Sequence, residues 1–180
     1  MAEIDQPVTP EPQYHVNEQL IQQRMDAYKE EQNLPLGILG GAIGGLLGAV
    51  IWAAVSYFTE YQIGWLAVGV GFLVGFGVRL LGKGIDRIYG ILGGVIALVS
   101  VLLGNLLANF GFLAKALEMT YLETLLNFRY EKFFDFIAAT FSPMDILFYA
   151  IAVYAGYRYA FRKIPQEKLL EGAVTEVKQN

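Results

Sequence analysis

The sequence predicts an all-α membrane protein, in which four transmembrane helices form a compact bundle packed through glycine. Three observations predict it. Hydrophobic residues make up 55% of the 180 residues and charged residues only 17%, which is more apolar than an ordinary soluble domain. No charged side chain occurs from Leu34 to Phe58, a run longer than the roughly 20 residues that span a hydrocarbon core. The same run carries a glycine at almost every third or fourth position.

These glycines indicate close helix contacts in lipid. In water each mid-helix glycine costs roughly 1 kcal/mol relative to alanine, whereas in a bilayer the backbone must form a helix in any case. Small residues spaced four apart then let two helices approach closely. We expect the strip to pack against another helix of the same chain, with a homo-oligomeric seam as the alternative. The predicted packing positions are Gly37, Gly41, Gly44, Gly48, Gly71, Gly75, Gly90 and Gly94.

The hydrophobic runs divide the chain into three regions. The predicted transmembrane domain is 34–161, with spans at about 36–58, 63–81, 88–110 and 143–161. The last span begins at Ser142-Pro143-Met144-Asp145, where an N-cap serine, a first-turn proline and an early acid are typical of a helix start. Residues 111–141 interleave charges with aromatics, which favours an amphipathic helix in the outer interface. Residues 1–33 are expected to be disordered and then briefly helical, and 162–180 form a tail.

Lysine and arginine predict the orientation, because they are enriched on the cytoplasmic side. With a cytoplasmic N-terminus, ten of these residues lie inside and three outside. Both termini are therefore expected in the cytoplasm. The aromatic residues around the first hairpin, from Trp52 to Trp65, are typical of an interfacial belt.

A short peptide that occurs twice suggests an internal repeat. The pentapeptide at 37–41, Gly-Ile-Leu-Gly-Gly, recurs 53 residues later at 90–94, at the start of the third span. Duplication of a two-helix unit would explain it, as in transporters with parallel repeats. The alternative, which we favour from sequence, is that two glycine-rich helices share a short peptide by chance.

One stretch carries a resemblance to a family. The run from Gly64 to Arg79, followed by Gly82-Lys83-Gly84-Ile85-Asp86, resembles a group of small uncharacterised multi-pass bacterial membrane proteins with a glycine-rich core. The likeness covers about 34–107. It implies a bacterial inner-membrane location and transfers no catalytic or binding residue.

Polar residues in or near the membrane are the candidate functional positions. Arg79, Lys83 and Arg87 lie at the expected cytoplasmic end, where they follow the positive-inside pattern and could also contact anionic lipid headgroups. Asn105 and Asn109, one turn apart on the third span, could form interhelical hydrogen bonds or line a polar path.

No group of residues with the pattern of a catalytic or metal site is evident in the sequence. The chain has no cysteine and one histidine, and it contains no HExxH or phosphate-loop motif. We therefore expect no catalytic, cofactor-binding or metal site, and the net charge of −4 argues against a nucleic-acid partner. A non-enzymatic membrane protein that packs with itself or binds a membrane protein partner is the leading hypothesis. A small channel or transporter that uses Asn105 and Asn109 is the alternative.

Overall fold

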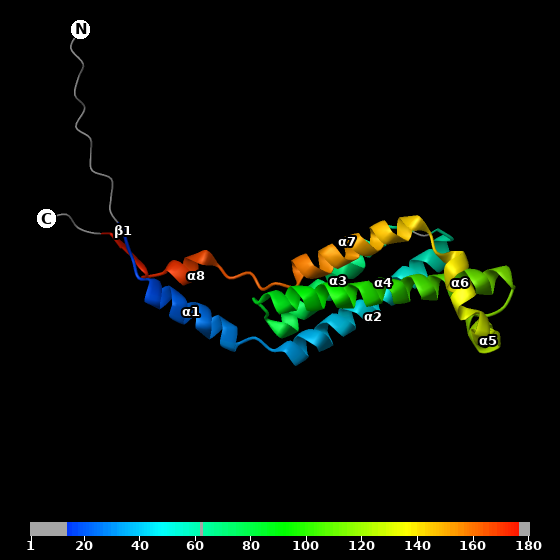
Figure 1. The fold of residues 1–180 in the computed structure, drawn as a ribbon, viewed down its shortest axis with the longest axis horizontal. Coiled ribbons are helices and arrows are strands. Elements are labelled where there is room, and N and C mark those ends of the chain that lie inside the picture. The colour runs from blue at the N-terminus through cyan, green and yellow to red at the C-terminus, as the bar shows by residue number, and fades with distance from the viewer. Residues whose placement is uncertain (1–13, 62, 177–180) are drawn as a thin grey trace, which may run out of the picture. The chain divides into compact units, whose positions relative to one another are not determined.

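The computed structural model describes residues 14–61 and 63–176, and this part of the chain is mostly α-helical (Figure 1). It divides into two compact units, one formed by the two ends of the chain and the other by residues 31–162. The disorder expected for the first residues of the chain falls outside the described residues.

The first unit joins the N-terminal and C-terminal segments of the chain. Strands β1 (Tyr14–Val16) and β2 (Val174–Glu176) pair antiparallel. Helix α1 (Glu18–Glu30) contacts the short helix α8 (Gln166–Leu170). The Arg24 guanidinium donates a hydrogen bond of 2.7 Å to the carbonyl oxygen of Lys168. The strands were not predicted, because three-residue strands carry too little alternation to be recognised.

The second unit is built from four apolar helices. They are α2 (Leu34–Thr59), α3 (Leu66–Gly82), α4 (Arg87–Ala116) and α7 (Pro143–Tyr159). The Asn33 side chain caps α2 by accepting from Leu36 N–H, and Ser142 and Asp145 form a reciprocal capping box at the start of α7. By length and composition α2 and α4 can cross a membrane, and α7 with the preceding short helices forms a bent pair that makes a third candidate span.

The contacts give the direction of each helix. Gly37 of α2 lies against Gly82 of α3, and Gly48 lies against Val70, so α2 and α3 run antiparallel. Gly75 of α3 contacts Tyr159, and Gly71 contacts Ala155, so α3 and α7 run parallel. Helix α4 runs antiparallel to α7 and parallel to α2 (Figure 1).

Glycines occupy the closest helix crossings. A methyl group on Gly40 would collide with the carbonyl oxygen of Gly77, and one on Gly93 with the carbonyl oxygen of Gly156. Each of the eight predicted packing glycines faces another helix of the same chain; Gly41, for example, would place a Cβ 2.8 Å from Val78 Cγ2. Within the described residues, only Gly69 and Gly172 would leave open space around an added Cβ.

The two copies of the pentapeptide make equivalent contacts. A Cβ on Gly40 would meet Gly77 and, at 3.2 Å, Leu81 Cβ, whereas one on Gly93 would meet Gly156 and, at 2.9 Å, Ala160 Cβ. Gly40 and Gly93 are 53 residues apart, and both partner pairs are 79 residues apart. One constant shift therefore relates α2 to α4 and another relates α3 to α7. The pair α2–α3 and the pair α4–α7 therefore pack through equivalent positions.

The segment after the third span differs from the prediction. Helix α4 continues to Ala116, six residues into the segment that was expected to be amphipathic. The expected single amphipathic helix is three short ones: α5 (Tyr121–Asn127), a 3-10 turn η1 (Tyr130–Lys132) and α6 (Phe133–Thr140). The axis bends by 89° between the η1–α6 segment and α7. Helix α6 therefore lies across the end of the four long helices (Figure 1).

An aromatic cluster holds this segment against α4. The Phe110 ring lies 5.0 Å from that of Phe128 and 5.1 Å from that of Phe136, and Phe128 and Phe136 lie 5.3 Å apart between centroids. Edge-to-face aromatic pairs add stabilisation beyond their buried area. Phe110 itself is buried. One of the aromatic residues expected in an interfacial belt, Trp52, instead lies in the core and is only 2% exposed.

Candidate functional site

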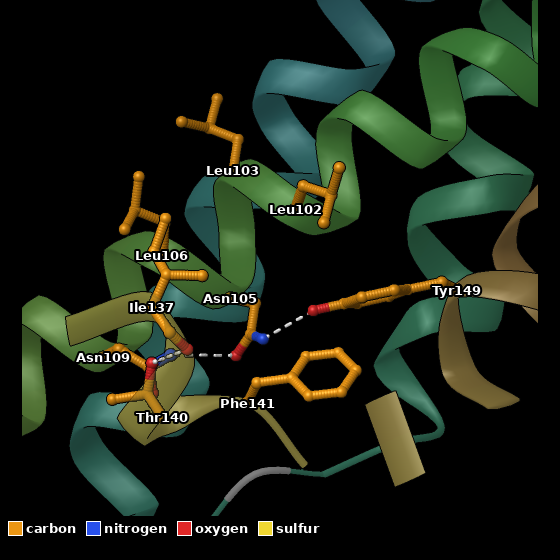
Figure 2. A pocket seen from close by; sticks show the side chains of 9 residues that line it. All are labelled: Leu102, Leu103, Asn105, Leu106, Asn109, Ile137, Thr140, Phe141 and Tyr149. Carbon is orange, nitrogen blue, oxygen red and sulfur yellow. Dashed lines mark hydrogen bonds between the residues drawn. The ribbon is translucent and has the colours of Figure 1, made fainter. Parts of the chain in front are cut away.

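A cavity of about 310 Å³ lies where α4, α6 and α7 meet (Figure 2). Leucines of α4 and the aromatic and aliphatic side chains of 137–141 form its walls. Four side chains with polar atoms, two of them the asparagines singled out from sequence, complete the lining. The lining residues are Leu102, Leu103, Asn105, Leu106, Asn109, Ile137, Thr140, Phe141 and Tyr149.

Three of the four polar side chains form a connected network, and Thr140 bonds to the backbone of its own helix. Asn105 Nδ2 donates a hydrogen bond of 2.7 Å to the Tyr149 hydroxyl oxygen, and Asn109 Nδ2 donates one of 3.4 Å to Asn105 Oδ1. Thr140 Oγ1 donates to the carbonyl oxygen of Phe136 at 2.9 Å. Asn105 is 7% exposed and Asn109 is 9% exposed. Helix α4 is thus joined to α7 by a partly buried amide–phenol hydrogen bond.

Local structure explains how these groups come together. Asn105 and Asn109 are four residues apart, so they lie on one face of α4. Tyr149 lies one turn beyond Asp145, whose carboxylate accepts from Ser142 N–H at 2.9 Å and fixes the start of α7. The aromatic cluster of Phe110, Phe128 and Phe136 fixes α6, which carries Thr140. Sequence reasoning found the asparagines but missed Tyr149, whose placement depends on the packing of α7 against α4, and Thr140, whose placement depends on the bend between α6 and α7.

The cavity carries no formal charge. None of its nine lining side chains is an acid or a base. An ion placed there would lose its hydration without a counter-charge from the wall, which costs several kcal/mol. The arrangement suits hydrogen bonding to a neutral molecule.

A second buried polar pair lies on α2. Trp52 Nε1 and Ser56 Oγ make no hydrogen bond within residues 14–61 and 63–176, although Trp52 is 2% and Ser56 0% exposed. Leaving such a group unpaired costs about 1–3 kcal/mol. When α2 is aligned with α4 by the 53-residue shift of the repeat, Trp52 corresponds to Asn105 and Ser56 corresponds to Asn109. Both copies of the repeated unit therefore carry buried polar side chains at the same two positions. Aligning the copies in the sequence could have identified Trp52 and Ser56 from the asparagines.

The basic residues at the opposite end take different partners. Glu31 Oε2 accepts from Arg162 Nη1 at 2.9 Å and from Lys83 Nζ at 3.3 Å. Hydrogen bonds from Arg162 and then Lys83 lower the pKa of Glu31 from its ordinary value. Arg79 and Arg87 form no ion pair in the described part of the chain. Of the three predicted headgroup contacts, Lys83 is thus already engaged by a carboxylate.

The function of the site is identified neither by a metal-binding cluster nor by similarity to a known protein. Among the described residues, no group of three or more His, Cys, Asp or Glu side chains could hold a metal ion. No protein-family model, no curated protein and no solved structure matches this chain.

Proposed function

We propose that residues 31–162 form a four-span domain of a bacterial inner membrane, with both ends of the chain in the cytoplasm. The alternating directions of α2, α3, α4 and α7 support this topology. Helices α3 and α7 have 17 residues each, about 26 Å at 1.5 Å per residue. That is slightly less than a core of about 30 Å, and a mismatch of this size costs fractions of a kcal/mol per Å.

The placement of α6 agrees with this topology. A helix perpendicular to a transmembrane helix lies parallel to the membrane plane, where an amphipathic segment is expected. The end of the domain at which α6 lies carries few basic residues. The opposite end carries Arg79, Lys83, Arg87, Arg158 and Arg162. The basic end is the cytoplasmic end by the positive-inside rule.

The protein acts in this proposal by binding a membrane-resident molecule rather than by catalysis. The observation that carries the proposal is the uncharged cavity with its network of Asn105, Asn109 and Tyr149. A mostly apolar pocket with a few convergent polar groups is typical of a ligand site. The packing glycines already contact other helices of the same chain, so they are not exposed to a second copy. This favours a ligand or partner at the cavity over a glycine-mediated homo-oligomer.

Photocrosslinking in native membranes tests the binding proposal. A benzoylphenylalanine placed at Ile137, in the cavity wall, should give ultraviolet-dependent adducts that the same residue at Ile51, an exposed position on α2, does not give. Mass spectrometry of the adduct would identify the bound molecule. Identical adduct patterns at both positions would contradict the proposal.

Cysteine labelling tests the topology, because the chain has no native cysteine. Glu131→Cys, next to α6, should react with a membrane-impermeant maleimide added to the outside of intact cells. Arg87→Cys, at the basic end, should react only after the cells are opened. The reverse pattern would invert the proposed orientation, and labelling of both in intact cells would rule out the topology.

A small transporter is the second candidate. The two buried polar pairs at equivalent positions of the repeat favour it, since substrate sites in transporters lie between repeats. Reconstituted vesicles should then show solute flux that Asn105→Leu abolishes. Flat flux across a broad panel of neutral solutes would eliminate this candidate.

A further inference from the structure

We propose, building on the binding function above, that the cavity between α4, α6 and α7 holds the head of an uncharged lipid alcohol of the diacylglycerol type. The lipid enters from the outer leaflet; its hydroxyl group donates a hydrogen bond to Thr140, and an ester carbonyl oxygen accepts one from the Tyr149 hydroxyl. Charge, hydrogen-bonding capacity and the surface around the cavity each support this chemical class.

Charge selects a neutral head. All nine lining residues are uncharged, and Asp145, which is buried near the start of α7, has a carboxylate oxygen engaged by the Ser142 N–H at 2.9 Å. A phosphate head would therefore be desolvated without a cation to pair with it. Common anionic phospholipids are disfavoured for this reason.

The hydrogen-bonding groups select a hydroxyl. The Tyr149 oxygen accepts from Asn105 Nδ2 at 2.7 Å, so its own proton remains available to donate to a ligand oxygen. Thr140 Oγ1 donates to the Phe136 carbonyl at 2.9 Å, so its lone pairs remain available to accept. A diacylglycerol offers both functions, because its hydroxyl can donate to Thr140 while an ester carbonyl accepts from Tyr149.

Size and surroundings select a lipid. A volume of about 310 Å³ lies at the lower end of the range for ligand pockets, enough for a glycerol head and the first carbons of a chain. Leu102 on the cavity wall continues a stripe of exposed apolar side chains along α4, formed by Ile91, Val95 and Leu98. This stripe runs from the cavity toward the cytoplasmic end. An acyl chain on it would extend into the membrane from a head at the exterior level, as in an outer-leaflet lipid.

The test uses the full-length protein in phosphatidylcholine nanodiscs with a diacylglycerol that bears a diazirine on the first carbons of one acyl chain, next to the head. Peptide mapping should place the label within 102–109 and 137–141, and unlabelled dioleoylglycerol should compete. Tyr149→Phe removes one hydrogen bond and should weaken binding about three- to tenfold. Tyr154→Phe, which changes a 67% exposed tyrosine of the same helix, should bind like the wild type.

Further arms separate this inference from the proposed function. Thr140→Val provides a second variant should Tyr149→Phe lower the melting temperature. Phosphatidic acid with the same diazirine chain should label the cavity at least tenfold less. Equal or stronger labelling by phosphatidic acid would overturn the choice of a neutral lipid while leaving a binding function intact. Labelling spread evenly over the exposed helix faces, or unchanged in both variants, would overturn the lipid site, and the Ile137 crosslink would then report independently on whether the cavity binds anything.

Discussion

Gly40 of α2 and Gly77 of α3 cross with each Cα facing the other's carbonyl oxygen, so that neither position has room for a methyl group. The clash would involve backbone atoms, which cannot rotate away as a side chain can. The crossing therefore limits how α2 and α3 can be placed at this point.

We predict that Gly40→Ala destabilises the protein by about 1–3 kcal/mol, the usual cost of overpacking. Thermal unfolding in detergent, followed by loss of monodisperse protein, would measure it. Gly69→Ala is the matched control on α3, because a Cβ there meets nothing within 4 Å, and its melting temperature should equal or slightly exceed that of the wild type. Equal losses in both variants would mean that general helix effects, and not the crossing, determine the outcome.

The repeat makes a second prediction at Gly93. Its crossing with Gly156 reproduces that of Gly40 with Gly77, so Gly93→Ala should lower the melting temperature by a similar amount. Because the two crossings involve different helix pairs, the losses in the double variant should add to within about 0.5 kcal/mol. A Gly93→Ala variant as stable as the wild type would refute the equivalence of the two helix pairs.

Local signals in the sequence predicted the long helices, whereas long-range packing decided where they end. Hydropathy, glycine spacing and the Ser142–Asp145 cap are local signals, and the four long helices lie close to the expected residues. Helix α4 continues through Gly111 to Ala116, into the segment 111–141 whose interleaved charges and aromatics, Lys115 among them, had predicted a separate amphipathic helix. That lysine instead bonds back to the end of α2.

The candidate site shows the same limit. Asn105 and Asn109 could be singled out because polar residues in an apolar helix are rare, and their shared face follows from their spacing. Tyr149 could not be joined to them, because a tyrosine in a span rich in tyrosine carries no signal of its own. The partner is determined by the antiparallel packing of α4 and α7, 44 residues apart in sequence for this pair.

Lys115 gives a third prediction. Its Nζ donates to the Tyr57 carbonyl oxygen at 2.7 Å and to Glu60 Oε1 at 2.8 Å, and it lies 4.6 Å from the centre of the Tyr57 ring. Lys115→Met should speed hydrogen exchange at the end of α2 more than Glu60→Gln does, because Glu60→Gln leaves the carbonyl bond in place. Equal exchange in the two variants would show that the ion pair alone is responsible.

The Glu31 ion pairs make stability depend on pH. Hydrogen bonds from Arg162 and Lys83 lower the pKa of Glu31 below its ordinary value of 4.5. A carboxylate with a lowered folded-state pKa stabilises the fold fully above the unfolded-state value and loses that contribution as the pH falls through the folded-state value. The melting temperature of Glu31→Gln should therefore lie below that of the wild type at pH 7, and the two should converge as the pH falls below 4.5.

The neighbouring acid is the control for that measurement. Glu30→Gln makes the same change of charge at an exposed residue that is not a partner of Lys83 or Arg162. Its difference from the wild type should be smaller than that of Glu31→Gln at pH 7. A constant difference for Glu31→Gln from pH 7 to pH 3 would show that the carboxylate charge has no role in the effect.

The aromatic cluster gives the last prediction, which connects the fold to the site. Phe136 packs against Phe110 and Phe128, whereas Phe134, two residues away on α6, is 82% exposed and contacts only the ring of Phe133 among the aromatic pairs of the described residues. Phe136→Ala should release α6 from α4 and speed amide exchange over 133–140, and Phe134→Ala should not. Because α6 closes one wall of the cavity, Phe136→Ala should also weaken photolabelling at 102–109 while leaving the melting of the four long helices nearly unchanged. Faster exchange without weaker labelling would show that the ligand is held by α4 and α7 alone.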